Sequence, residues 1–259
     1  MYRFLLSRRW LGFAALVVVV AAVCIRLGMW QFDRLDQRRA DNERIEDNLA
    51  VAPAPVDVVS SGDAVDPADE WRRVTVTGRY DADHQVILTQ QTRDIGPGVD
   101  ILTPLLTSTG TAVLVDRGWL ATDEPSDLPD PPDPPTGDVG VTGWLRVDSD
   151  ADDWAITPDD GSVRAVASNG IEAALPYDLV PGWIALIDQQ PPADTGLDTP
   201  EEPDLGQGPH FFYGLQWWFF SALAVGGYIW FAWVEAHPRP RRESAEARQP
   251  PVSSGAPGE

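Results

Sequence analysis

The chain has 259 residues, with 40 Asp or Glu against 19 Arg and no Lys, which gives a formal net charge of −21. So acidic a chain is poorly suited to bind nucleic acid or to lie flat on anionic lipid. Its single cysteine excludes an intrachain disulfide, and the sequence holds no Cys/His cluster that would suit zinc or copper.

The first apolar run covers residues 10–30, and about 20 mainly apolar residues are enough to span a membrane. Three arginines precede the run, and Arg26 is its only charge, close enough to one end to reach the interface. A cleaved signal peptide is the alternative, but no small-x-small site precedes a polar stretch. We therefore expect an uncleaved transmembrane helix that follows a cytoplasmic N-terminus of residues 1–9.

The acidic middle of the chain, residues 31–209, is predicted to form one extracytoplasmic domain. Residues 31–49 are polar and rich in helix formers, so they are expected to extend the first helix until Pro53 and Pro55 stop it.

Alternation of polar and β-forming residues predicts the strands of this domain. They are expected at 71–80, 85–92, 99–106, 111–119, 139–147, 162–167 and 182–187. Residues 122–138 are rich in Pro and Asp, which predicts an extended, mobile linker. The β domain is therefore placed at about residues 70–188.

The second apolar run, residues 211–234, carries no charge, and the tail 235–259 is expected to be cytoplasmic and disordered. Residues 31–209 hold 36 acidic residues against 11 Arg, whereas arginines flank the membrane at both termini. The positive-inside rule then predicts that both termini are cytoplasmic. The expected fold is a membrane protein in which two transmembrane helices flank one mainly β (α+β) extracytoplasmic domain.

His210 opens the second helix at the outer interface and is the main candidate for chemistry. Residues three and four apart share a helix face, so His210, Tyr213, Gly214 and Trp217 form one stripe. An imidazole beside a glycine gap and aromatic rings would suit the axial ligation of a haem iron. The alternative is an interfacial histidine that only anchors the helix, and spacing alone leaves both interpretations open.

A second stripe, formed by Trp30, Arg34 and Arg38, lies on the first helix just outside the membrane. Two arginines on one face could pair with carboxylates such as haem propionates. The alternative is that they pair with Asp33, Asp41 or lipid headgroups.

The sequence argues against a hydrolase. It contains no Gly-x-Ser-x-Gly elbow, and His84, in a turn between predicted strands, has no partner that spacing could assign to it. The outer domain shows no convergent set of polar residues that would predict a pocket.

Several segments resemble the surfeit-one family of membrane proteins. LGMWQFDR at 27–34, followed by Arg38, is similar to the family's first-helix signature, and PHFFYGLQW at 209–217 is similar to its second-helix signature. WRRVTVTGRY at 71–80 and VLVDRGW at 113–119 follow in the family's order. The chain departs from the family's pattern with Arg38 where Lys is usual and with Asp116 where Asn is common.

The resemblance implies a bacterial assembly factor for aa3-type cytochrome c oxidase, rather than an enzyme, that sits in the cell membrane. Such a protein would bind haem a and assist its insertion into oxidase subunit I, with haem a synthase as a further candidate partner. It implies that His210 is the axial ligand of the haem iron and that Trp30 and Arg34 support the cofactor. Tyr213 and Trp217, from the same stripe as His210, would then flank the haem. Two alternatives stay open: a scaffold that stabilises oxidase subunits without haem, and a membrane-tethered sensor or enzyme that uses the β domain.

Overall fold

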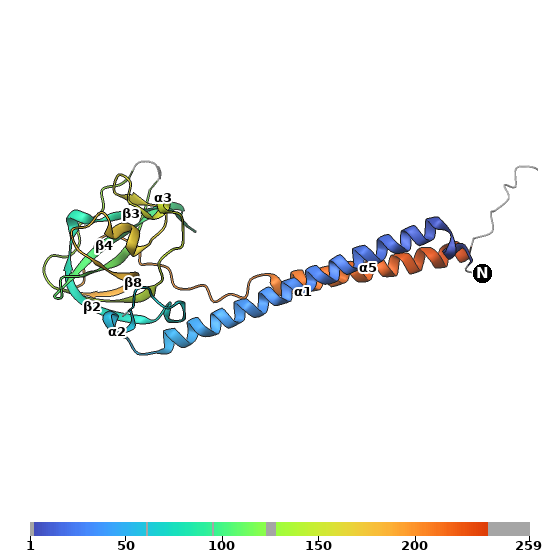
Figure 1. Cartoon of the computed structure of the whole chain (residues 1–259), viewed down its shortest axis with the longest axis horizontal. Coiled ribbons are helices and arrows are strands. Elements are labelled where there is room, and N and C mark those ends of the chain that lie inside the picture. Colours follow the sequence, from blue (N-terminus) through green and yellow to red (C-terminus); the bar gives the residue numbers. More distant parts are fainter. Residues whose placement is uncertain (1–2, 61, 95, 123–127, 238–259) are drawn as a thin grey trace, which may run out of the picture. The chain divides into compact units, whose positions relative to one another are not determined.

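The computed structural model describes residues 3–60, 62–94, 96–122 and 128–237 (Figure 1). The chain divides into two compact units, one formed by residues 1–37 with 207–259 and the other by residues 38–206. The disorder predicted for the C-terminal tail falls on residues outside the described part.

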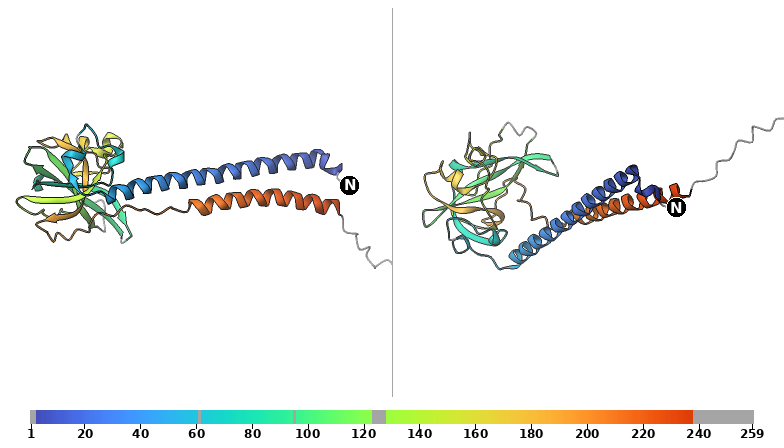
Figure 2. Two further views of the ribbon diagram at one scale, coloured as in Figure 1. Left: turned by 90° about the horizontal axis from the view of Figure 1, so that it is seen from below. Right: turned by 45° about the vertical axis from the view of Figure 1, so that its right-hand side comes forward.

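Two long helices make up the first unit. Helix α1 covers Arg8–Ala50 and contributes its first 30 residues to this unit, after a short 3-10 helix at Arg3–Leu6, and α5 covers His210–Ala236. They lie side by side and antiparallel in both views of Figure 2. Ring contacts show that the helices are antiparallel. The ring centres of Trp10 and Tyr228 are 5.6 Å apart, and those of Phe32 and Phe211 are 6.2 Å apart.

The surface of this helix pair is largely apolar. Among the described residues, α1 and α5 are the helices long and apolar enough to cross a membrane, and only 17% and 11% of their apolar windows are buried. A core helix of a water-soluble domain would be mostly buried, so these exposed apolar surfaces are compatible with a membrane protein. Helix α1 runs without interruption past Trp30 and ends at Ala50, three residues before Pro53.

The second unit is a β-barrel-like α+β domain. Its described residues form one eight-stranded sheet in the order β1-β2-β6-β8-β5-β4-β3-β7, and an additional β2–β4 pairing closes the central strands (Figure 1). The strands are β1 Ala54–Pro55, β2 Arg73–Tyr80, β3 Val86–Arg93, β4 Gly96–Thr107, β5 Ala112–Ala121, β6 Val139–Arg146, β7 Ser162–Val163 and β8 Leu179–Gln190. The short helices are α2 Val56–Val59, η2 Pro67–Asp69, η3 Ala82–His84, α3 Asp153–Ile156 and α4 Ser168–Glu172.

Alternation along the strands gives the barrel an inner and an outer apolar cluster. Successive side chains of a strand point to opposite faces, so Val113 and Val115 of β5 pack inside with Ile184, while Leu114 packs outside with Leu102 and Ile171. Strand β5 is therefore buried on both faces. Asp116 lies two residues after Leu114, so its side chain points to the same outer face of the barrel.

The predicted strands correspond to β2, β3, β4, β5, β6 and β8, with ends shifted by a few residues. The strand predicted at 162–167 shortens to β7, Ser162–Val163. Residues 123–127 of the predicted Pro/Asp linker fall outside the described part. The rest of that segment is held against the barrel, because Leu128 packs on an apolar cluster and Arg117 donates to the carbonyl oxygens of Pro132 and Asp133 at 2.8 and 3.2 Å.

Candidate functional site

His210 is the first residue of α5, and its side chain turns toward α1. Its Nδ1 lies 2.9 Å from Oε1 of Gln31. An amide oxygen can only accept, so Nδ1 carries the hydrogen of this bond, and Nε2 is the ring nitrogen left for a ligand. A side-chain carbon added at Gly208 would lie 3.5 Å from Nε2, so this glycine keeps one approach to the nitrogen clear. The hydrogen bond to Gln31 orients the imidazole ring, and proteins orient metal-binding histidines in this way.

The aromatic residues predicted to surround His210 lie on the surface of the helix pair. Tyr213 and Trp30 are 48% and 47% exposed, and Trp217 is half-buried with its ring 6.0 Å from that of Phe220. Their rings are thus available to a flat apolar ligand or to lipid.

The open face expected at Gly214 is not present. Gly214 is buried, and a side-chain carbon built on it would lie 2.8 Å from Cζ of Phe32, so that ring already fills the gap. Gly28 of α1 plays the reciprocal role, because a carbon there would lie 2.4 Å from the indole of Trp218. The two glycines let large rings of the opposite helix pack close to the backbone, as small residues do between membrane helices.

The arginines of the first-helix stripe have separate roles. Arg34 lies over the Trp30 ring at 5.8 Å and donates to Oε1 of Gln37 at 3.0 Å. Arg38 belongs to the barrel unit, where it binds the carboxylate and carbonyl oxygens of Asp204 at 3.1 and 2.6 Å. Arg38 therefore anchors the segment that leads to α5, and it pairs with neither of the acids expected from its sequence spacing.

Gln31 and Phe32 are the site residues that the sequence did not single out. Both belong to the first-helix signature, but a signature gives no register between two helices. Only the packing of α1 on α5 shows that Gln31 faces His210 and that Phe32 faces Gly214.

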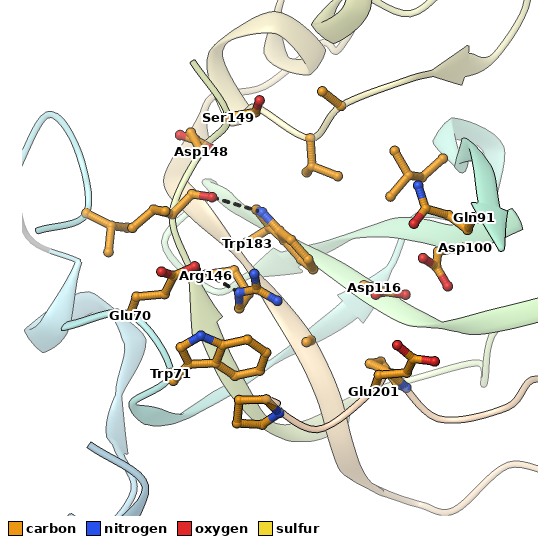
Figure 3. A pocket seen from close by; sticks show the side chains of 18 of the residues that line it. Glu70, Trp71, Gln91, Asp100, Asp116, Arg146, Asp148, Ser149, Trp183 and Glu201 are labelled. Atoms are coloured by element: carbon orange, nitrogen blue, oxygen red, sulfur yellow. Dashed lines mark hydrogen bonds and ion pairs between the residues drawn. The ribbon is translucent and has the colours of Figure 1, made fainter. Parts of the chain in front are cut away.

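A cavity of about 930 Å³ lies in the barrel unit, contrary to the expectation that this domain lacks convergent polar residues (Figure 3). Neighbouring strands supply its central side chains: Arg146 from β6, Trp183 from β8, Asp116 from β5 and Asp100 from β4. The sheet order β6-β8-β5-β4 and the direct register of Arg146 with Trp183 bring them together on the outer face of the barrel.

Arg146 is held flat between two indoles. Its guanidinium carbon lies 3.9 Å from the Trp71 ring centre and 5.1 Å from that of Trp183, and its Nε donates to Glu70 at 3.1 Å. Trp71 adopts a left-handed backbone with φ of 69°, which is unfavourable for a bulky residue, and its N–H donates to the carbonyl of Leu145. The fold thus fixes this stacked arginine at the cavity wall.

The carboxyl groups of the cavity are electrostatically unusual. Burial, together with the nearby charge of Asp100, raises the pKa of Asp116 to about 8. Burial also raises the pKa of Asp100 to about 6, although Arg93 at 3.1 Å opposes that rise. The sequence shows Asp116 inside an apolar run (AVLVDRGW). It does not show that an outer apolar cluster covers this face of the barrel, which is why Asp116 is buried.

Comparisons with known proteins agree with the motifs of the two helices. The model of the SURF1 family matches residues 18–222. Proteins of Mycobacterium bovis and Mycobacterium tuberculosis, both described as uncharacterised SURF1-like proteins, are 32% identical over 253 residues, which is 95% of this chain and 92% of each relative. The family is generally linked to cytochrome oxidase assembly. The match covers both helices and the barrel between them, and on this basis the chain belongs to the SURF1 family.

Proposed function

We propose that this chain is a membrane-anchored assembly factor for aa3-type cytochrome c oxidase, one that binds haem a through His210 and assists its insertion into subunit I. The observation that supports this most directly is the His210–Gln31 hydrogen bond of 2.9 Å, which occupies Nδ1 and leaves Nε2 available to ligate an iron at the start of α5. Haem a is cargo in this proposal, handed on without catalysis, and haem a synthase is the candidate source.

The residues around His210 fit a porphyrin outside the helix pair better than one between the helices. Phe32 fills the space beside Gly214, whereas the rings of Trp30 and Tyr213 are about half exposed. Arg34 would offer a guanidinium to a propionate, since its Gln37 partner is neutral and takes up one of its five donors. Gln31 holds the imidazole hydrogen on Nδ1, so it acts as a positioning residue.

The proposed topology places both termini in the cytoplasm and the barrel outside. The antiparallel contact of Trp10 with Tyr228 supports it, because both chain ends then leave the helix pair on the same side, next to the terminal arginines. Alkaline phosphatase fused after residue 240 should be inactive, and phosphatase inserted at exposed Asp178 should be active. The reverse pattern would refute the orientation.

The central experiment is an absorption spectrum of the detergent-purified full chain after co-expression with haem a synthesis. A Soret band at about one haem per chain is expected, and His210→Ala should abolish it while membrane insertion stays intact. His84→Ala is the matched control, because His84 lies in the barrel unit and its Nδ1 is 2.8 Å from Asp81. A wild-type protein without a Soret band would favour the alternative of a haem-free scaffold.

Two further variants test the roles of the neighbours. Gln31→Ala should shift the haem spectrum and lower retention, whereas Gln31→Glu should retain haem because a carboxylate also accepts from Nδ1–H. Arg34→Ala should weaken retention by about 1–3 kcal/mol, the range for a charge-assisted hydrogen bond. Equal retention in Gln31→Ala and wild type would remove Gln31 from the site.

A further inference from the structure

The barrel cavity has a shortage of positive charge around its buried carboxyl groups. Figure 3 shows Asp100, Asp116 and Glu201 facing the same space. Arg93 pairs with Asp100 at 3.1 Å and with Glu201 at 3.8 Å, so one guanidinium already serves two of these acids. The third carboxyl, on Asp116, is left without an ion pair among the described residues.

Asp116 is placed to receive a ligand. The residue is 4% exposed, and its Oδ1 accepts the backbone N–H of Gly118 at 2.9 Å. Its second oxygen accepts no hydrogen bond within the described part of the chain, and the carboxyl group lines the cavity. This oxygen is therefore open to a donor that a ligand would supply.

Arg146 does not supply the missing donor. Trp71 and Trp183 cover the two faces of its guanidinium. Its Nε donates to Glu70 at 3.1 Å, so its charge is balanced by a carboxylate on the side of the cavity away from Asp116. Its field reaches Asp116 only as a minor effect. Trp183 instead gives the cavity an indole wall, a surface on which flat cations stack.

We propose that this cavity binds a cationic nitrogen group, a guanidinium or an ammonium, held by the carboxyl of Asp116 and packed against Trp183. The surroundings favour a cation, because the lining holds eight Asp or Glu and three Arg. The volume of about 930 Å³ exceeds what a single side-chain head group needs, so the group can be carried by a small molecule or by a peptide. This inference goes beyond the haem-handling function and does not depend on it.

Binding should be coupled to the release of a proton. The groups that set the charge state of Asp116 are Asp100 on β4, Arg93 on β3 and Arg146 on β6, and burial dominates them, so the carboxyl is largely protonated at pH 7. A bound cation favours the ionised form and expels that proton. Affinity should therefore rise on the order of 10-fold between pH 6.5 and 8.5, since a guanidinium stays charged throughout.

The test is isothermal titration calorimetry on the detergent-purified full chain with N-acetyl-arginine amide as the probe. N-acetyl-citrulline amide is the matched neutral control, because its urea has nearly the same shape. Arginine should bind at least about 10-fold more tightly than citrulline, and titrations in two buffers of different ionisation enthalpy should show close to one proton released at pH 7. Equal binding of both probes, or no binding of either, would overturn the proposal.

Two variants test whether Asp116 forms the site, and a titration with a peptide distinguishes a small-molecule ligand from a protein partner. Asp116→Asn should weaken arginine binding at least about 10-fold and abolish its pH dependence. Asp178→Asn, which makes the same charge change at an exposed position outside the cavity lining, should leave both unchanged. An arginine inside a blocked pentapeptide that binds more tightly than the single residue indicates a protein partner, and equal affinity indicates a small molecule. Unchanged binding by Asp116→Asn would refute the site.

Discussion

Replacing Asp116 with asparagine should stabilise the barrel at neutral pH, although the residue is buried. The carboxyl has a pKa of about 8 in the folded chain against an ordinary value of 3.8. At pH 7 the unfolded state ionises freely, whereas the folded state must keep the proton. With 1.36 kcal/mol per pH unit over the interval from about 4 to 7, this group alone lowers the free energy of unfolding by about 4 kcal/mol.

The sign of the pH dependence follows from the raised pKa. Between pH 4 and pH 8 the folded state binds one proton more than the unfolded state, so the stability contributed by this group falls as pH rises and levels off above pH 8. Asparagine does not titrate, and its amide oxygen can still accept the Gly118 N–H that lies 2.9 Å from Asp116. The stability difference between the variant and wild type should therefore grow from pH 5 to pH 8.

Urea unfolding of the detergent-solubilised chain, followed by tryptophan fluorescence, measures this difference. For a urea m-value of 1–3 kcal/mol/M, about 4 kcal/mol corresponds to a rise in midpoint of more than 1 M at pH 7. Asp178→Asn is the control for the change in net charge and should show no pH-dependent gain. A variant less stable than wild type at pH 8, or a difference that does not vary with pH, would refute the assignment of a buried, proton-holding carboxyl.

Two predictions test the close packing. Gly143→Ala should destabilise the barrel by about 2 kcal/mol or more, because the new carbon would lie 2.3 Å from the carbonyl oxygen of Ala185. Gly140→Ala is the control and should be nearly neutral, because the nearest atom to its new carbon is 4.0 Å away. Equal melting temperatures of the two variants would contradict this prediction. Gly28→Leu should separate the helices by displacing the Trp218 indole. Cysteines placed on α1 and α5 should then crosslink more slowly, and crosslinking at the wild-type rate would contradict the prediction.

The sequence predicted the elements better than the contacts between them. Alternation along WRRVTVTGRY and the apolar run of β5 located their strands, because each pattern is local. Closure of the barrel through the β2–β4 pairing depends on residues far apart in the chain, and no periodicity reveals it. The sequence predicted six strands close to their observed ends and a seventh, at 162–167, that is longer than β7, but it did not reveal their order in the sheet.

The candidate sites show the same division. His210 stood out from its position at a helix start, but its partner Gln31 is 179 residues away, and the space beside Gly214 turned out to be filled by Phe32. The barrel cavity escaped prediction because Asp116 and Trp183 come from strands that only the sheet order brings together. Arg146 lies inside a predicted strand, and its two indole neighbours, Trp71 and Trp183, come from other parts of the chain that no local pattern connects to it.

The measurement that tests the central claim most directly is imidazole rescue of haem binding. His210→Gly removes the side chain whose Nε2 is proposed to ligate the iron and leaves a cavity next to Gln31. The purified variant should lack the Soret band of wild type, and added imidazole should restore haem binding with a histidine-like spectrum, because Gln31 can still accept its N–H. A His210→Gly protein that keeps the wild-type haem content and spectrum without imidazole would contradict the proposal that His210 holds the haem.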